Sequence, residues 1–368
     1  MIFFIWTSLS AQEEKKIFSH PEYVEGFTIK QKKGFQILEI SKMNQGDMNT
    51  LPESYVLVHK DSSQLIETLK KTYKHLIKIP VNRMVVTSTT HLPGIEMLGA
   101  AKTVVGFPGT QYVSSASFRS LIASGHITEL GQQEQLNIEM VLSVAPEIVI
   151  GFAIGEKPKA YLPIEKSGIP VLLNHDWLAH HPLGKAAWIY LYGALLNKLE
   201  RSDEIFKSIH DRYMEARALA QKANTAPTVL SGAMYKDVWY APGGNSWAAQ
   251  FIQDANGTYI FKNDHTGSDA YSIEYVLNQG KEAQFWVGPA QFTSYEALRK
   301  SSPHYQQFRA FQKQNIFSFS AKKGTTGGVL YYELAPQRPD LVLRDLIAIL
   351  HPNVLAAHTF TFFTSLDD

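Results

Sequence analysis

The chain has 368 residues, of which 45% are hydrophobic and 12% aromatic, and its formal net charge is +1. This composition excludes a disordered protein, and the length favours two α/β lobes over a single core. The balanced charge provides no field that would attract nucleic acid or an anionic membrane, and the absence of cysteine excludes disulfides, thiolate metal sites and cysteine nucleophiles.

Residues 1–11 resemble the second half of a secretory signal peptide. The apolar run from Ile2 to Trp6 precedes small residues of the kind found at a cleavage site. A short buried strand is the alternative interpretation. Because nothing later in the chain approaches the roughly 20 apolar residues of a membrane span, we expect an exported protein with no stable membrane insertion.

Residues 12–80 are predicted to form a β-rich N-terminal segment. Residues 27–30 and 35–40 alternate in polarity on either side of Gly34, which indicates a hairpin. Residues 55–58 are a third strand candidate. We find no chemical motif in this segment.

Residues 81–182 are predicted to form an N-terminal α/β lobe. Its apolar runs alternate with helical patterns, which is typical of a parallel, Rossmann-like sheet. The predicted strands are residues 83–87, 104–107, 148–150 and 171–173. Loops at the carboxyl ends of these strands are the expected binding edge.

Residues 183–223 are predicted to form one long bridging helix. Apolar side chains recur at three- and four-residue intervals from Trp188 to Tyr213, while Pro182 suits the start and Pro227 follows the end. At 1.5 Å per residue such a helix would be about 55 Å long, enough to connect two lobes.

Residues 224–355 are predicted to form a second α/β lobe, and residues 356–368 a tail that packs back or frays. This lobe opens with a strand at residues 228–230, continues through an aromatic loop at 231–247, and closes with an amphipathic helix at 339–350.

A short sequence pattern occurs once in each lobe. Residues 137–142 and 272–277 each begin with a polar cap and carry a glutamate in the first helical turn. Each helix is followed by an apolar strand that ends at a glycine, Gly151 or Gly288. The Pro-Gly pairs at 108–109 and 242–243 precede the two copies at similar spacing, so the chain has two similar halves.

Two lobes, a bridging helix and this repeated pattern resemble the substrate-binding proteins of bacterial ABC importers for iron–siderophore complexes and cobalamin. The resemblance covers about residues 80–353. It implies an α/β fold of two Rossmann-like lobes bridged by one long α-helix, the helical-backbone metal-receptor type, here with the added N-terminal β-rich segment.

The resemblance also implies a function. We expect a monomeric, soluble binding protein in the periplasm of a Gram-negative-type envelope, where it delivers a small-molecule metal chelate to ABC importer permease subunits. The chelate would be an Fe(III)–siderophore, a corrinoid such as cobalamin, or haem, with no intrinsic cofactor. No nucleic-acid partner is expected.

By position in the motif, the resemblance assigns transporter docking to Glu139 and Glu274. A carboxylate in the first turn of an exposed helix is favoured by the helix dipole and stays free to pair with a permease arginine. Two such anchors would bind bivalently. The alternative is that each glutamate only completes a helix N-terminus.

The loops between the lobes carry the candidate ligand-binding residues. These are Tyr112, Trp177, Trp239, Tyr240, Trp247 and Arg338. Aromatic rings suit a large flat ligand and arginine suits an anionic one. Core packing is the alternative for any one ring, and a surface position is the alternative for the arginine.

Two other functions are weighed against chelate binding. A bare Zn or Mn ion could be held by histidines among residues 91, 175, 180 and 181 with Asp176 or Asp269; within the chelate hypothesis, Tyr112 or His91 could ligate haem iron. An enzyme acting in the two-lobe cleft is the other alternative, but no catalytic motif with recognisable spacing occurs, so we predict that the protein is not an enzyme.

Overall fold

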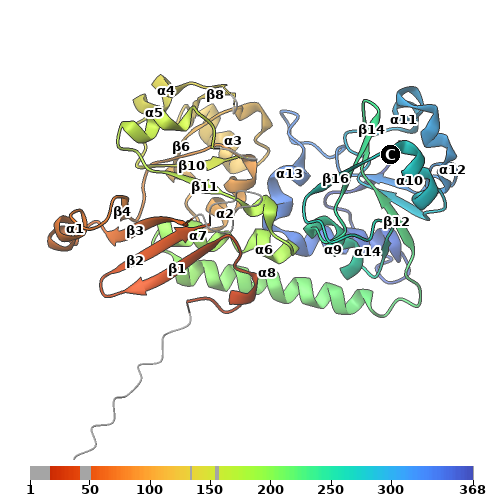
Figure 1. Ribbon diagram of the computed structural model, residues 1–368, viewed down its shortest axis with the longest axis horizontal. Helices are drawn as coiled ribbons and strands as arrows, with labels where there is room; N and C mark the ends of the chain where they lie inside the picture. Colours follow the sequence, from red (N-terminus) through yellow and green to blue (C-terminus); the bar gives the residue numbers. More distant parts are fainter. Residues whose placement is uncertain (1–16, 42–50, 133–134, 154–156, 368) are drawn as a thin grey trace, which may run out of the picture.

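The computed structural model describes residues 17–41, 51–132, 135–153 and 157–367. Two lobes lie side by side above a long helix, α8, which runs beneath both (Figure 1). The candidate signal segment, residues 1–11, lies outside the described residues. Within the described residues, no helix combines the length and the apolar character needed to cross a membrane.

The N-terminal segment forms a four-stranded sheet beside the first lobe. Its elements are η1 (Pro21–Tyr23), β1 (Phe27–Lys32), β2 (Phe35–Ile40), β3 (Glu53–His59), α1 (Ser63–Leu69) and β4 (Leu76–Ile79). Strands β1, β2 and β3 are antiparallel neighbours, and β4 pairs parallel to β3. The predicted hairpin and third strand are confirmed.

The N-terminal lobe contains a five-stranded parallel sheet. Its strands are β5 (Met84–Val86), β6 (Val104–Phe107), β7 (Thr128–Glu129), β10 (Ile148–Phe152) and β11 (Val171–Asn174), in the spatial order β11-β10-β5-β6-β7. The connecting helices are η2 (Thr89–His91), α2 (Leu92–Met97), η3 (Ala101–Thr103), η4 (Thr110–Tyr112), α3 (Ala116–Ala123), α4 (Ile138–Ser143), α5 (Tyr161–Lys166) and η5 (Asp176–Leu178), with a small hairpin of β8 (Gly131–Gln132) and β9 (Gln135–Leu136). The four strands predicted from apolar runs are all present.

The connection between the lobes consists of three helices, so the prediction of one continuous helix over residues 183–223 is wrong. They are α6 (Pro182–Ala186), α7 (Ile189–Leu195) and α8 (Leu199–Ala220). Asn197 adopts a left-handed conformation, with φ of 56°, and the N–H of Lys198 donates to the Gly193 carbonyl at 2.6 Å. This is a Schellman-type helix end. The bridging helix is α8 alone, with 22 residues.

The C-terminal lobe contains a second five-stranded sheet, with the order β15-β12-β17-β18-β19. Its strands are β12 (Thr228–Ser231), β15 (Thr258–Tyr259), β17 (Phe285–Val287), β18 (Ile316–Ser318) and β19 (Thr364–Ser365), and its helices are α9 (Trp247–Asp254), α10 (Ile273–Gly280), α11 (Tyr295–Ser301), η6 (Pro303–Gln307), α12 (Arg309–Gln312), α13 (Leu330–Leu334), η7 (Ala335–Gln337) and α14 (Pro339–Leu350). The tail returns to the lobe, because β19 pairs with β18 and Phe362 is fully buried.

The predicted aromatic loop at residues 231–247 is instead ordered as strands. A separate antiparallel sheet joins β13 (Ala233–Tyr235), β14 (Val238–Pro242) and β16 (Ser268–Tyr271). The expectation of a loop is wrong here because aromatic side chains favour strands.

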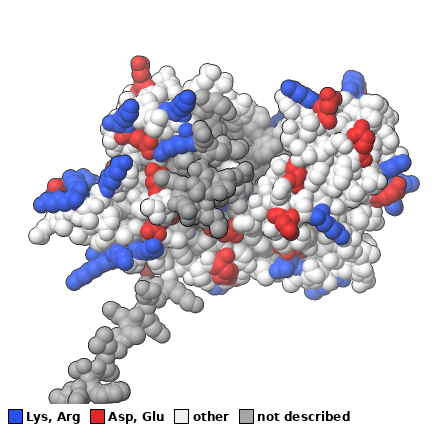
Figure 2. Space-filling view, in the orientation of Figure 1, with Lys and Arg blue, Asp and Glu red and all other residues white. Residues whose placement is uncertain are grey.

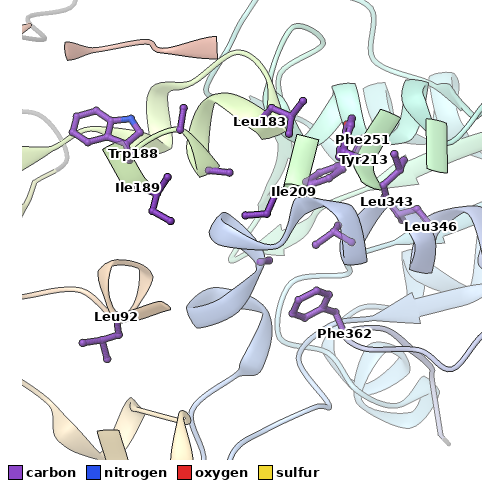
Figure 3. Close-up of a cluster of buried hydrophobic side chains, with 14 of the residues drawn as sticks. Leu92, Leu183, Trp188, Ile189, Ile209, Tyr213, Phe251, Leu343, Leu346 and Phe362 are labelled. Atoms are coloured by element: carbon purple, nitrogen blue, oxygen red, sulfur yellow. The ribbon is translucent and has the colours of Figure 1, made fainter. Parts of the chain in front are cut away.

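One hydrophobic cluster continues from the first lobe through α6, α7 and α8 into the second. Figure 3 shows part of it, with α6 and α7, α8, α9 and α14 contributing side chains to the same region. The labelled residues include Leu183, Trp188, Ile189, Ile209, Tyr213, Phe251, Leu343 and Leu346. Because the lobes share this packing, the connection is part of the core and not a linker. On the face shown in Figure 2, basic and acidic side chains of the described residues are interspersed.

Candidate ligand-binding cleft

A cleft of about 1810 Å³ lies between the lobes and is lined by residues from both. Thr90 and Trp177 come from the N-terminal lobe, α6 provides the floor, and most of the remaining wall comes from the C-terminal lobe. Pockets for drug-sized ligands usually measure about 300–1,000 Å³. The cleft therefore has room for a considerably larger molecule.

Aromatic side chains from several elements of the second lobe line this cleft. Tyr240 and Tyr271 lie on the adjacent strands β14 and β16, where Tyr240 is 45% exposed. Phe319 and Tyr331 stack with their ring centroids 4.3 Å apart. Ser246 caps α9 by accepting a hydrogen bond from the N–H of Ala249 at 3.2 Å, which places Trp247 in the first turn at the cleft edge. These rings offer flat apolar surfaces to a ligand.

Lys185 on α6 is a cationic side chain in the lining of the cleft. Its residue is only 8% exposed, and its ammonium lies 4.3 Å from the centroid of the Trp247 ring, in the geometry of a cation–π contact. Burial lowers the pKa of Lys185, whereas the buried carboxylate of Asp176 opposes that shift. Burial likewise raises the pKa of Asp176, opposed by Lys185. An anionic ligand group would find a partly desolvated cation here.

In another part of the cleft lining, Asp269 organises a polar network. Its carboxylate accepts hydrogen bonds from Asn263 at 2.8 Å and Tyr271 at 3.0 Å, and His265 Nδ1 lies 2.6 Å away. Burial alone would raise the pKa of Asp269, but these hydrogen bonds outweigh burial and lower it. All four residues line the cleft, so this wall is pre-ordered and carries acceptors as well as donors.

Three of the aromatic residues predicted to bind ligand lie in the lining, namely Trp177, Tyr240 and Trp247. Trp239 lies elsewhere: it is fully buried, donates from Nε1 to the Ser231 carbonyl at 3.1 Å and packs on Trp286. Neighbouring residues of a strand point to opposite faces. Because Tyr240 faces the cleft, Trp239 faces the core.

Two other predicted ligand residues lie outside the lining. Tyr112, in η4, is 61% exposed. Arg338 pairs within the chain, where its Nε and Nη2 each lie 2.8 Å from an oxygen of Asp340. Asp340 also accepts a hydrogen bond from Arg212 of α8 at 2.8 Å. The guanidinium group of Arg338 is therefore already paired with Asp340 in the first turn of α14. Asp340 in turn connects α14 to α8.

The repeated pattern forms matching helix starts in the two lobes. Asn137 accepts a hydrogen bond from the N–H of Met140, and Ser272 accepts one from the N–H of Tyr275. Glu139 and Glu274 occupy the first turns of α4 and α10 and are exposed. Two hydrogen bonds lower the pKa of the Glu274 carboxyl group. The larger effect comes from the backbone N–H of Glu274 itself and the smaller from the Ser272 hydroxyl. Both carboxylates are thus presented to solvent on separate lobes.

The histidines weighed as ligands of a bare ion do not converge. His91 is fully buried, and burial lowers its pKa to about 3. His175 is also buried, whereas His180 contacts Glu25 and His181 lies 3.5 Å from Asp254. Among the described residues, His20, His210 and Asp211 come together as one potential metal-binding group, and none of these three lines the cleft.

Sequence reasoning missed several residues of the cleft, chiefly Lys185, Tyr271, Phe319 and Tyr331. Lys185 did carry a signal, because it is a single charge within an apolar stretch of α6 and α7. Tyr271 carried none, since strands β14 and β16 are brought together only by the tertiary fold.

Two α/β lobes joined through helices, with a large cleft between them, define the class of two-lobed ligand-binding proteins. The chain matches the periplasmic binding protein family over residues 84–322 and belongs to that family. The family comprises substrate-binding proteins of the ABC-importer type. The β-rich N-terminal segment precedes the matched region.

The chain is also similar to individual proteins. An uncharacterised lipoprotein of Methanocaldococcus jannaschii is 25% identical over 324 residues, which are 84% of this chain and 75% of the relative. A possible iron-binding periplasmic solute-binding protein of Staphylococcus epidermidis has a TM-score of 0.59 at 14% identity, covering 74% of this chain and 99% of that one. A periplasmic haem-binding protein of Pseudomonas aeruginosa has a TM-score of 0.56 at 20% identity, covering 74% and 93%. At these identities the solved structures show the fold. The family and the lipoprotein relative support a location outside the cell or anchored to its membrane.

Proposed function

We propose that the cleft binds a large anionic metal chelate, foremost an Fe(III)–siderophore, and that the protein delivers it to the permease of an ABC importer. The observation that carries this proposal is the cleft itself, with about 1810 Å³ of space, an aromatic wall and one buried lysine. Such a site matches a bulky ligand that has flat apolar parts and negative charge.

The positive charge of Lys185 distinguishes among the candidate ligands. Catecholate and carboxylate groups make ferric siderophores of those classes anionic, whereas three hydroxamates only neutralise Fe(III), and haem carries two propionates. The amide side chains of a corrinoid are mostly neutral, so they would offer Lys185 no negative charge beyond that of Asp176. Lys185 therefore favours a siderophore first, haem second and cobalamin third.

Tryptophan fluorescence tests this proposal directly. Trp177 and Trp247 line the cleft, whereas Trp188, Trp239 and Trp286 are buried in the core. Titration with ferric siderophores, haemin and cobalamin should quench emission saturably with one of them, and Trp247→Phe should remove much of that quench. The proposal is lost if saturating concentrations of all three classes leave the spectrum unchanged.

We further propose that Glu139 and Glu274 dock the protein on its permease. Their support is that both are exposed carboxylates in the first turns of capped helices, one on each lobe. Charge-assisted pairs with permease arginines could form without disturbing the cleft.

The docking proposal has a matched control. Changing Glu139 and Glu274 together to alanine should abolish import and leave chelate affinity unchanged. Glu67 and Glu296 are also exposed helical glutamates, and Glu296 lies in the first turn of α11. Their double alanine variant should import normally. Import that survives the first double change would rule the docking pair out.

A binding role is favoured over the two alternatives. A bare Zn or Mn cargo would require ligands that converge in the cleft, and the group of His20, His210 and Asp211 that the described residues bring together lies outside it. For catalysis, the cleft contains Asp269 and His265 in contact, but the His265 ring is largely exposed and its contact is with a carboxylate. We therefore assign no catalytic residue.

A further inference from the structure

The segment that leads into the N-terminal sheet is fixed on the bridging helix. The backbone N–H of Ser19 donates to Asp203 of α8 at 2.8 Å, and the Phe18 ring lies 4.4 Å from that of Tyr190. In Figure 1 this part of the chain meets α8 beneath the first lobe. Residues far apart in sequence are therefore held together at this place.

Two histidines and the carboxylate of Asp211 converge at this contact, with Glu22 beside His20. The rings of His20 and His210 stack with centroids 3.7 Å apart and an interplanar angle of 23°. His20 Nδ1 lies 3.2 Å from Glu22 Oε1, and His210 Nδ1 lies 3.1 Å from Asp211 Oδ1. One ligand atom each from His20, His210 and Asp211 all lie within 4.8 Å of one another.

These separations suit a divalent transition metal. Zinc bonds to imidazole nitrogen and carboxylate oxygen are about 2.0–2.2 Å long, so neighbouring ligand atoms of a tetrahedral site are about 3.3 Å apart. The pair of His210 Nδ1 and Asp211 Oδ1 is already near that spacing. A carboxylate can only accept, so the Nδ1 of His210 carries the proton that a bound metal would replace.

The surroundings support this ligand group. Lys207 donates to the second oxygen of Asp211 at 2.8 Å, which orients that carboxylate as an outer-shell partner would. Both imidazoles are mostly covered, with 22% and 14% of the side chain exposed for His20 and His210, while both carboxylates reach solvent. An ion can therefore enter without rearrangement of the fold.

We propose that His20, His210 and Asp211, with Glu22 orienting His20 from outside the ligand group, form a binding site for Zn²⁺ or a similar imidazole-seeking divalent ion such as Cu²⁺ or Ni²⁺. None of these residues lines the cleft. The site is therefore separate from the cargo, and the ion would join the N-terminal segment to α8.

Calorimetric titration of the full-length protein with ZnCl₂, after dialysis against a chelator, tests the site. We expect one ion per chain, and a loss of about tenfold or more in affinity for His210→Ala and for His20→Ala. His59→Ala is the matched control, because His59 forms a single pair with Asp61, two residues away, at 3.4 Å. That variant should bind zinc as the parent does.

Two further measurements keep the result interpretable if an alanine variant is unstable. His20→Gln preserves the size of the side chain and should also lose zinc affinity, while circular dichroism reports its folding. Electron paramagnetic resonance of the Cu²⁺-loaded parent should show two coordinated nitrogens, and His20→Gln only one. The proposal is overturned if zinc does not bind saturably up to millimolar concentration, or if folded His20 and His210 variants bind it as the parent does.

Discussion

Lys185 is the single side chain on which the choice of cargo depends. Replacing it with methionine keeps the apolar stem over Trp247 and removes the charge. An ionic hydrogen bond contributes roughly 1.5–3 kcal/mol, so affinity for an anionic chelate should fall about 10- to 100-fold. The substitution would also remove the positive charge beside Asp176. Because burial already raises the pKa of Asp176, protonation of this carboxylate would compensate for the lost charge.

The control for Lys185→Met is Lys236→Met. Lys236 lies beside Tyr235 outside the cleft lining and should bind chelate normally. Fluorescence titration of both variants with one ferric siderophore and with cobalamin measures the difference. If Lys185→Met weakens cobalamin as much as the siderophore, the lysine acts through packing and not through charge.

The buried carboxyl group of Asp340 should make the stability of the folded protein depend on pH. Burial would raise its pKa, but the hydrogen bonds and charges of Arg338 and Arg212 outweigh burial and lower it. A carboxyl group with a lowered pKa stabilises the folded state above its unfolded pKa, near 3.9, and this contribution disappears as the pH falls through the folded value.

Asp340→Asn should therefore reduce the free energy of unfolding by about 2 kcal/mol at pH 7. Near pH 3 the difference from the parent should shrink, because this lies below the unfolded pKa, so the unfolded carboxyl group is mostly protonated and the charged pairing in the folded state contributes less. Urea unfolding at both values measures this. An equal loss at both pH values would mean that the carboxylate charge is not what stabilises the start of α14.

The break between α7 and α8 shows where sequence periodicity stops being informative. Apolar spacing continues past residue 197, because α7 is buried throughout and α8 buries one face in the same core. The break itself depends on one exposed residue in a left-handed conformation, Asn197. Asparagine tolerates that conformation better than most residues, yet its presence in a helical pattern is too common to predict a helix end.

Substitutions at Asn197 test this break without opening a cavity. Asn197→Gly should leave stability unchanged or slightly raised, whereas Asn197→Val should lower the free energy of unfolding by about 1–2 kcal/mol because a β-branched residue is strained at positive φ. Thermal or urea unfolding measures both. In a continuous helix the order would reverse, since glycine is the poorer helix former.

The β13-β14-β16 sheet explains which part of the cleft was predictable. The sequence marked an aromatic-rich stretch near the cleft, and Tyr240 and Trp247 indeed line it. Only the strand alternation assigns Trp239 to the core and Tyr240 to the surface, and that requires knowing that the stretch is a strand.

Helix caps depend on local chemistry, so the positions of Glu139 and Glu274 could be predicted from residues close in sequence.

At the scale of the whole molecule, the lobes are held together at more than the bridging helix. Glu333 of α13 accepts hydrogen bonds from the backbone N–H groups of Ser114 and Ser115 in the N-terminal lobe, at 2.6 and 2.9 Å. Gly328 approaches so closely that a Cβ there would lie 2.0 Å from the Tyr112 carbonyl oxygen. The shared core and these contacts both resist relative movement of the lobes.

This arrangement predicts that ligand binding changes the overall shape little. Small-angle scattering of the parent, with and without its chelate, should give profiles that agree within error, and a strong contraction on binding would contradict the rigid arrangement. Glu333→Ala leaves two partly buried N–H groups without their carboxylate partner, which should cost about 1–3 kcal/mol of stability, and the ligand-free variant should scatter as a more open particle. Glu67→Ala, a change at an exposed residue of α1, should scatter as the parent does, because it alters charge without touching the junction of the lobes.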